Sequence, residues 1–412
     1  MSRTLLLFLL RRLRDGRIVL SEGGRRLELG PPSDLTVEIR VNDPRAYREI
    51  LTGGSTGLAD SYVAGRWECD DLVGLVRIAA RNVVWLDRVR QRCAFALAPW
   101  HRARALVRPR TLVRARKDVE AHYDLSNELY ELFLDETMTY SCAVFERPDM
   151  TLREAQEAKL ERICRKLDLG PGDELLEIGG GWGGLAIYAA TTRGCRVVTT
   201  TISKAQRTEA IERVRAAGVE HLVEVRGQDY RELRGRWSKI VSVEMIEAVG
   251  WRQLGEYLER CGRLLTDDGL FCLQAITIDD RAYDVEKGGN SFANTRVFPG
   301  GFLPSLSVIL RNVARRTTLR TVHLEEIGEH YGETLRHWRE RFAAADVARL
   351  EALGFDDRFR RLWRFYLSYV EGGFRERRIG DVQLLLAGPD FRGESALLKR
   401  VSAGPESGPL PA

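Results

Sequence analysis

The spacing of apolar and polar residues predicts a small mixed domain in the first part of the chain. Short apolar runs separated by Gly and Pro are typical of strands, and apolar residues repeating every three or four positions are typical of helices. The predicted strands are Arg17 to Leu20, Leu27 to Leu29 and Leu35 to Val41, and the predicted helices lie around Tyr47 to Leu51 and Asp70 to Asn82. We therefore expect a small α+β domain in residues 1–115, ending in a basic linker.

From Val119 onwards, strand-like and helical segments alternate. Such alternation implies right-handed crossovers and predicts an α/β domain with a doubly wound parallel sheet. The expected strands are Glu174 to Ile178, Arg196 to Thr201, Leu222 to Arg226, Lys239 to Glu244 and Gly269 to Thr277. The expected helices carry Leu125, Leu129, Leu132 and Phe133, span Leu152 to Leu167 and Leu254 to Leu265, and begin at Trp182 and Lys204. This domain should span residues 116–400, before a disordered tail at 401–412.

The composition indicates the broad class of protein. With 412 residues, 44% hydrophobic and 30% charged, the chain is typical of a soluble protein of two or three domains. Its seven cysteines include no C-x-x-C pair, which indicates a reducing compartment such as the cytoplasm and predicts no metal site. The apolar run Thr4 to Leu10 precedes Arg11 and Arg12, the reverse of the order in a secretory signal. We therefore expect a docking helix there and no membrane span.

Positive charge gathers between Arg77 and Lys117, where twelve Lys and Arg residues accompany a single acid, Asp87. Two interpretations stay open, a solvated helix face and a surface for an anionic partner. The interleaved aromatic residues, among them Trp85 and Trp100, favour an anionic membrane surface over nucleic acid. We therefore expect peripheral association with the inner face of a membrane and no binding of nucleic acid.

The segment LLEIGGGWGG ends a predicted strand with a glycine cluster at the start of a helix. Gly179, Gly181 and Gly183 lack the Cβ atoms that would block close approach of a ligand to the backbone. A glycine string alone is weak evidence, since many such strings are only turns. Glu177, two residues before the first glycine, favours S-adenosylmethionine, because the cationic amino acid part of that molecule needs a carboxylate and there is no pyrophosphate to hold.

Polar residues follow the next two predicted strands. Thr201 and Gln206 carry a hydroxyl and an amide that can hold a ribose. Gln228 and Asp229 precede the aromatic Tyr230, where a carboxylate can accept a hydrogen bond from an adenine amino group. Each group alone is typical of a helix cap or a turn. Together, at the ends of successive strands, they predict one cofactor site.

Seven segments of the chain, in order, resemble those of the cyclopropane-fatty-acyl-phospholipid synthases and the related mycolic acid methyltransferases. They are AHYDLSNELYELFLDETMTYSCAVF, LLEIGGGWGG, TISKAQ, QDYREL, VSVEMIEAVG, VFPGGFLPS and HYGETLRHW. The resemblance implies a class I S-adenosylmethionine-dependent methyltransferase with a seven-stranded sheet, behind a lipid-associated N-terminal domain. It also implies S-adenosylmethionine as methyl donor and the cis double bond of a membrane phospholipid acyl chain as acceptor.

The resemblance extends to the chemistry. Methyl transfer to an alkene gives a carbocation that must be shielded from water and deprotonated. In the family a bound bicarbonate takes the proton. By resemblance its pocket includes Cys142, Glu247 and Tyr331, with backbone near Val243 and Ile276. The segment that contains Tyr123, Tyr140 and Ser141 is expected beside the cofactor.

Two positions depart from the family pattern. Gln274 stands where many members have a histidine ligand of bicarbonate, and a glutamine can donate a hydrogen bond but cannot titrate near neutrality. Val370 stands where members have a cysteine once considered a nucleophile, which excludes covalent catalysis at that position. We interpret both changes as features of a branch of the family.

Three functions stay open on this evidence. The first is synthesis of a cyclopropane fatty acyl chain. In the second, a hydride shift in the same cation leads to a methylene branch, which a separate reductase would convert to a methyl branch. The third, of another class, is an inactive lipid-binding or cofactor-binding module. A homodimer is left open as well.

Overall fold

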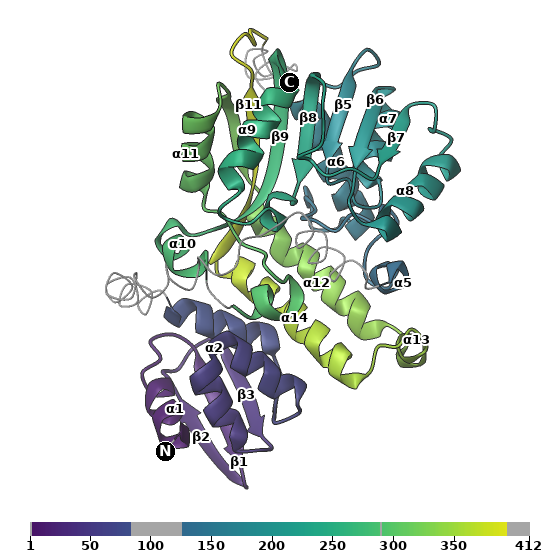
Figure 1. Cartoon of the computed structure of the whole chain (residues 1–412). Helices are drawn as coiled ribbons and strands as arrows, with labels where there is room; N and C mark the ends of the chain where they lie inside the picture. The colour runs from purple at the N-terminus through teal and green to yellow at the C-terminus, as the bar shows by residue number, and fades with distance from the viewer. Residues whose placement is uncertain (1, 84–125, 289–290, 394–412) are drawn as a thin grey trace, which may run out of the picture.

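The computed structural model describes residues 2–83, 126–288 and 291–393. Figure 1 shows a small sheet at one end, a large sheet at the other and long helices between them. The small sheet has the order β2-β1-β3-β4. Its predicted strands are confirmed, and the β1–β2 turn falls on Gly23 and Gly24, whose φ angles of 54° and 76° suit glycine. The elements of this part are α1 (Ser2–Leu10), β1 (Arg17–Glu22), β2 (Arg25–Leu29), β3 (Thr36–Val41), α2 (Arg45–Val63), β4 (Trp67–Cys69) and a helix at residues 72–83.

The large sheet has seven strands in the order β10-β11-β9-β8-β5-β6-β7. Five of them run parallel, namely β5 (Glu174–Ile178), β6 (Arg196–Thr200), β7 (Val223–Arg226), β8 (Trp237–Val243) and β9 (Leu265–Ile278). The seven-stranded α/β fold is confirmed. The five predicted strands are the parallel ones. The two strands that were not predicted are antiparallel, since β11 (Ile379–Ala387) pairs with β9 and β10 (Arg320–Glu326) with β11 in that direction. An apolar run shows that a strand is buried on both faces but does not show its direction.

Helices cover both faces of this sheet. Leu176 and Ile178 of β5 pack with α9 (Leu254–Leu264) and α11 (Leu306–Arg316). The opposite face of the sheet, on which Leu175 of β5 lies, packs with α6 (Leu152–Lys166) and α7 (Gly184–Arg193). Because successive strand residues point to opposite faces, a strand covered on both sides is apolar at nearly every position. α8 (Lys204–Ala216) connects β6 to β7.

The helices α12 (Gly328–Ala344) and α14 (Asp357–Arg375) lie between the two sheets, joined by α13 (Val347–Ala352) (Figure 1). They share one apolar core with the N-terminal part, in which the rings of Tyr62 and Phe365 lie 5.7 Å apart. At its edge Glu376 accepts from Arg77 and Arg81 at 2.7 and 2.9 Å. Two members of the predicted basic run thus share one acidic partner. The ten others lie outside the described residues, as does the predicted tail.

The helix expected to reach Phe133 is shorter than predicted. α5 covers Asn127–Glu131, and the chain then turns at Asp135, whose carboxylate accepts from the backbone N–H of Thr137 at 2.9 Å. Met138 follows with a φ of 53°. The hydrogen bond of Asp135 therefore stabilises the turn that follows the helix.

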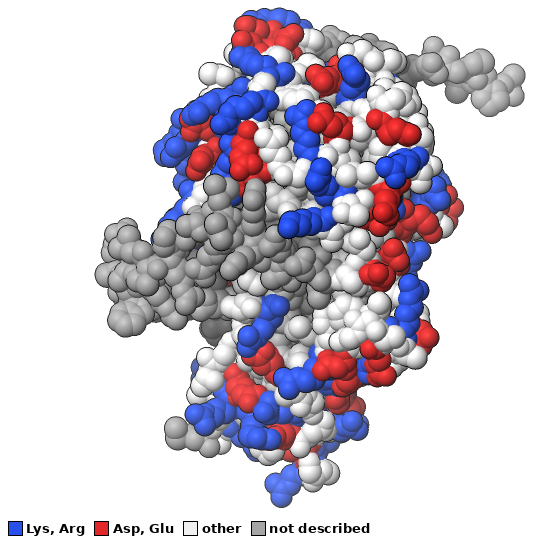
Figure 2. Space-filling model, turned by 45° about the vertical axis from the view of Figure 1, so that its right-hand side comes forward, with Lys and Arg blue, Asp and Glu red and all other residues white. Residues whose placement is uncertain are grey.

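Charges of both signs are mixed over the described part of the surface in Figure 2. They form ion pairs such as that of Arg296 with Asp60 at 2.6 Å, and each exposed pair contributes little to stability. Within the described ranges, no helix is both long and apolar enough to span a bilayer.

Candidate functional site

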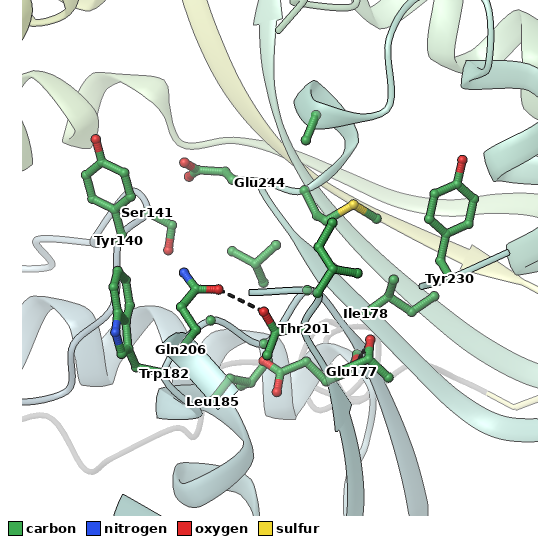
Figure 3. A pocket seen from close by; sticks show the side chains of 18 of the residues that line it. Tyr140, Ser141, Glu177, Ile178, Trp182, Leu185, Thr201, Gln206, Tyr230 and Glu244 are labelled. Carbon is green, nitrogen blue, oxygen red and sulfur yellow. Dashed lines mark hydrogen bonds between the residues drawn. The ribbon is translucent and has the colours of Figure 1, made fainter. Parts of the chain in front are cut away.

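A cavity lies at the carboxyl ends of the parallel strands, where doubly wound sheets bind their ligands. Its walls come from the loop at 138–141, α6, the glycine turn after β5, the ends of β6 and β8, and the turn after β7 (Figure 3). Nine of the predicted cofactor residues line it: Tyr140, Ser141, Glu177, Gly179, Gly181, Thr201, Gln206, Gln228 and Asp229. Gly183 does not, because it is the N-cap of α7, with a φ of 83°, and faces Ala210 of α8. Tyr123 lies outside the described residues.

The glycine turn is tied to the neighbouring strand. The N–H groups of Gly179 and Gly180 donate to the carbonyl of Thr200 at 3.0 and 2.9 Å. Gly181 has a φ of 56°, and no atom lies within 4 Å of the position that a Cβ would take. The space left by this missing side chain adjoins the cavity, so Gly181 serves both the turn and the opening.

Glu177 is buried in the wall beside this turn. Burial raises the pKa of its carboxyl to about 7, although Thr199 and Lys159 oppose the shift. Within the described part of the chain, its Oε2 has no hydrogen-bond partner. A buried carboxyl with an unsatisfied oxygen in a cavity wall suits a cationic group of a ligand.

The segment TISKAQ caps a helix, and its Thr201 and Gln206 also line the cavity. Ser203 caps α8, since its Oγ accepts from the N–H of Gln206 at 3.3 Å. Thr201 Oγ1 donates to Gln206 Oε1 at 2.8 Å, the dashed bond in Figure 3. This bond fixes the amide so that its NH2 group is the end offered to a ligand.

Tyr230 lies on the far side of the cavity from Tyr140 (Figure 3), and Asp229, the residue before it in the chain, also lines the cavity. Its two carboxylate oxygens accept from Nε and Nη2 of Arg231 at 2.9 Å each. Arg231 was not among the predicted site residues. This pairing holds the carboxylate in place, and a ligand N–H that reaches Asp229 must share an oxygen with the guanidinium.

Lys159 is a buried cation in the wall that the sequence analysis missed. Its Nζ donates to Ser141 Oγ at 2.8 Å. Burial lowers the pKa of this amine, and the carboxylate of Glu244 opposes that shift. The signal was present in the sequence, because Lys159 lies four residues from Ala155 and from Ile163, on the apolar stripe of its helix. A lysine on such a stripe is seldom fully buried unless it is paired.

Glu244, directly after β8, receives hydrogen bonds from three distant segments. Its Oε1 accepts from the backbone N–H of Cys142 and from Nε2 of Gln274, both at 2.8 Å. Its Oε2 accepts from the hydroxyl of Tyr331 at 2.6 Å. Three of the four predicted catalytic residues thus meet at a carboxylate that the sequence analysis did not single out. Cys142 contributes its backbone, since burial raises the pKa of its thiol well above the usual value.

Two more carboxyl groups adjoin Glu244. Glu247 Oε1 accepts from the N–H of Ile276 at 2.6 Å, and burial, with the charge of Glu244 adding to it, raises its pKa to about 8. Asp381 in β11 accepts from Gln274 at 2.8 Å, and burial followed by the charge of Glu244 raises its pKa well above the usual range. Burial also raises the pKa of Glu244, and the hydrogen bonds from Tyr331 and Cys142 oppose that shift. Among the three carboxyl groups of the cluster, Glu244 accepts the most donors, three on its two oxygens, and such donors favour its ionised form.

This arrangement does not fit a bicarbonate ion in the predicted pocket. The donors that would hold it are the amide of Gln274, the hydroxyl of Tyr331 and the N–H groups of Cys142 and Ile276. Each of them already donates to Glu244 or Glu247. A second anion at the same donors would also face the charge of Glu244 in a buried site.

Known proteins resemble this chain over most of its length. The family model described as mycolic acid cyclopropane synthetase matches residues 110–384. The tuberculostearic acid methyltransferase of Mycobacterium tuberculosis is 37% identical over 387 residues, which cover 90% of this chain and 88% of that protein. The cyclopropane-fatty-acyl-phospholipid synthase of Escherichia coli is 36% identical over 375 residues, covering 89% and 90%. Among solved structures, mycolic acid cyclopropane synthase CmaA1 complexed with SAH and CTAB has a TM-score of 0.61 at 31% identity and covers 66% of this chain and 98% of that one.

Proposed function

The chain belongs to the mycolic acid cyclopropane synthetase family, and from this premise we propose that it methylates the cis double bond of an unsaturated phospholipid acyl chain to give a cyclopropane. Family membership makes it an S-adenosylmethionine-dependent C-methyltransferase with the class I methyltransferase fold. One observation carries the proposed chemistry. The cavity has in its wall the carboxyl group of Glu244, whose oxygens accept three hydrogen bonds, and this reaction needs both a methyl donor and a group that removes a proton.

The cofactor residues have distinct roles in this proposal. Bound S-adenosylmethionine supplies an electron-poor methyl group. Glu177 balances the charge of its ammonium group, and the Tyr140 ring, 5.1 Å from that of Trp338, offers a π face to positive charge developing on the acyl chain. The methionyl end would lie near Gly179, Gly181, Tyr140 and Ser141, the ribose near Thr201 and Gln206, and the adenine near Gln228 and Asp229.

The name of one relative points to a second possible product. The tuberculostearic acid methyltransferase, 37% identical to this chain, is named for a methylated fatty acid. A methylene-branched chain that needs a separate reductase is therefore the alternative to a cyclopropane. The two products are isomers, since each adds one carbon and two hydrogens to the alkene, so their mass alone cannot separate them.

Incubation with S-adenosylmethionine and vesicles of dioleoyl phospholipid tests the proposal. Mass spectrometry of the recovered lipid should show the added CH2 unit. Proton NMR should then show the upfield protons of a cyclopropane, whereas olefinic protons of an exocyclic methylene would establish the alternative product. A protein that binds cofactor and vesicles but leaves every acyl chain unchanged would be an inactive binding module.

The affinity for S-adenosylmethionine should depend on pH through Glu177. Its carboxyl has a pKa of about 7, and a nearby ammonium group stabilises only the ionised form. Below pH 7 binding must first remove a proton, so we expect the affinity to fall about tenfold per pH unit as the pH drops and to level off above pH 7. Calorimetry with S-adenosylhomocysteine between about pH 5.5 and 7.5 measures this slope.

The control for this prediction is Glu177→Gln, which keeps the shape of the side chain but cannot ionise. The variant should bind more weakly at neutral pH and should show little dependence on pH below 7. The same slope in the variant and the parent would place the titrating group elsewhere and would contradict the assigned role of Glu177.

We propose that α1 forms part of a peripheral membrane contact. Leu5, Phe8 and Leu9 are 51%, 47% and 44% exposed on this helix, whereas Leu7 is buried in the core. An apolar helix face followed by basic residues suits the interface of an anionic bilayer. The predicted basic surface beyond residue 83 lies outside the described residues.

Serine at positions 5, 8 and 9 together should weaken binding to anionic vesicles. Each half-exposed apolar side chain contributes about 1 kcal/mol when a bilayer covers the rest of it, so we expect a loss of at least about tenfold in sedimentation assays. Val347→Ser removes a side chain that is 50% exposed on α13 and is the matched control, expected to bind as the parent does. Equal binding of the triple variant and the parent would show that α1 does not touch the lipid.

A further inference from the structure

Glu244 has an unusual backbone conformation as well as an unusual set of side-chain hydrogen bonds. Its φ of 47° lies in the left-handed region, which side-chain-bearing residues seldom adopt and glycine adopts without strain. Strained residues persist where surrounding contacts hold them, and they concentrate at functional sites. Here three donors hold the carboxylate between the cofactor cavity, which Glu244 lines, and the buried cluster behind it.

The three hydrogen-bond donors favour the ionised form of Glu244 and oppose the effect of burial. Lys159 lies close enough that its charge lowers the pKa of Glu244. Burial raises the pKa of Asp381 well above its usual range and that of Glu247 to about 8, which favours the neutral forms of both neighbours. A carboxylate that is hydrogen-bonded, charged and in contact with the cavity has the properties of a general base.

We propose that the Glu244 carboxylate is the catalytic base of this enzyme and takes the place of the bicarbonate ion expected from the family. This inference rests on the proposed methyl transfer to an alkene. It explains why the donors predicted for bicarbonate converge on a side chain of the protein itself.

The methyl transfer and ring closure need only the alkene, the methyl donor and Glu244. The π electrons of the alkene form the new carbon–carbon bond to the methyl group, and the sulfur keeps the pair of the broken bond, which leaves a carbocation on the acyl chain. A C–H bond of the new methyl group then breaks. Its electron pair closes the cyclopropane ring, and the proton goes to a carboxylate oxygen of Glu244, which later releases it to water.

Three variants test the proposal on the full chain with dioleoyl phospholipid vesicles. Glu244→Gln should lose turnover by about a hundredfold or more, the usual contribution of a general base, while calorimetry shows cofactor affinity within a few-fold of the parent. Glu244→Gly suits the backbone at this position and frees the donors. We expect it to be slow in bicarbonate-free buffer and to regain turnover, saturably, as bicarbonate is added. Glu329→Gln, the same change at an exposed glutamate on α12, should keep the turnover of the parent.

The parent should be indifferent to removal of bicarbonate from the buffer. Turnover that falls on removal, or parental turnover in Glu244→Gln, would overturn the proposal. A second measurement separates this inference from the proposed substrate. In carbon-13 NMR, Glu244→Gly should bind labelled bicarbonate and the parent should not, even if neither protein methylates phospholipid. Binding by the parent would show that Glu244 does not occupy the anion's place.

Discussion

Valine at position 181 is expected to abolish binding of S-adenosylmethionine. The Cβ of residue 181 would project into open space beside the cavity, where we place the methionyl end of the cofactor. The branched side chain fills the space that the ligand needs, so the affinity should fall at least about a thousandfold, equivalent to roughly 4 kcal/mol. Calorimetry with S-adenosylhomocysteine measures the loss.

The substitution also strains the backbone, because Gly181 has a φ of 56°. Strain of this kind costs about 1–3 kcal/mol and would lower the melting temperature without any role for the ligand. Gly218→Val is the matched control, since Gly218 has a φ of 69° and open space around its missing Cβ but lies at the end of α8, outside the cavity. The control should lose stability and keep its affinity. Parental affinity in Gly181→Val would mean that the glycine serves only the turn.

The periodicity of the sequence predicted the parallel part of the fold well. The strand Glu174–Ile178 agrees with β5 at both ends, because a strand covered on both faces is apolar at nearly every position. The antiparallel edge was not predicted, since β10 alternates weakly and the direction of β11 depends on the path through α12 and α14. The helix expected through Phe133 ends at Glu131, because Leu132 and Phe133 are buried or partly buried in the turn after it and their apolar spacing alone does not mark the helix end.

The cavity-lining residues that could be predicted from the sequence are polar residues that directly follow a predicted strand. Thr201 and Asp229 follow strands, so the topology alone brings them together. Lys159 and Asp381 come from a helix and from the antiparallel edge, and only the folded chain shows that they adjoin Glu244. The resemblance drew attention to Glu247 in VSVEMIEAVG and passed over Glu244, because it implied a bound ion where this chain supplies a side chain.

The glutamine at position 274, where many family members have a histidine, fits the presence of Glu244 beside it. Its amide donates to Glu244 and Asp381, and its carbonyl accepts from Nε2 of Gln383 at 3.0 Å. A neutral histidine, with one N–H, could not make both donations and also accept the third bond in the same geometry. The glutamine therefore suits a pocket that holds a fixed carboxylate.

Methionine at position 159 is expected to lower turnover near neutral pH by about tenfold or more, because the charge of Lys159 lowers the pKa of Glu244 and one pKa unit changes the ionised fraction about tenfold. Ser141 loses the donor to its hydroxyl, and Glu244 loses a positive charge that lowers its pKa. The sign of the pH effect follows from this. The pKa of Glu244 rises, the ionised base becomes scarcer near neutrality, and activity recovers as the pH is raised through the new pKa. A pH profile of kcat on dioleoyl vesicles should therefore shift to higher pH.

Lys166→Met separates this effect from a general loss of stability. Lys166 is also buried on α6, seven residues further on, where it pairs with Glu325 at 2.6 Å and donates to Gln383 at 2.5 Å. It does not line the cavity, so its loss should lower the melting temperature while the folded enzyme keeps the pH profile of the parent. If both lysine variants lost activity without an alkaline shift, Lys159 would act on stability alone. An alkaline shift confined to Lys159→Met would show that its charge sets the ionisation of the group that accepts the proton.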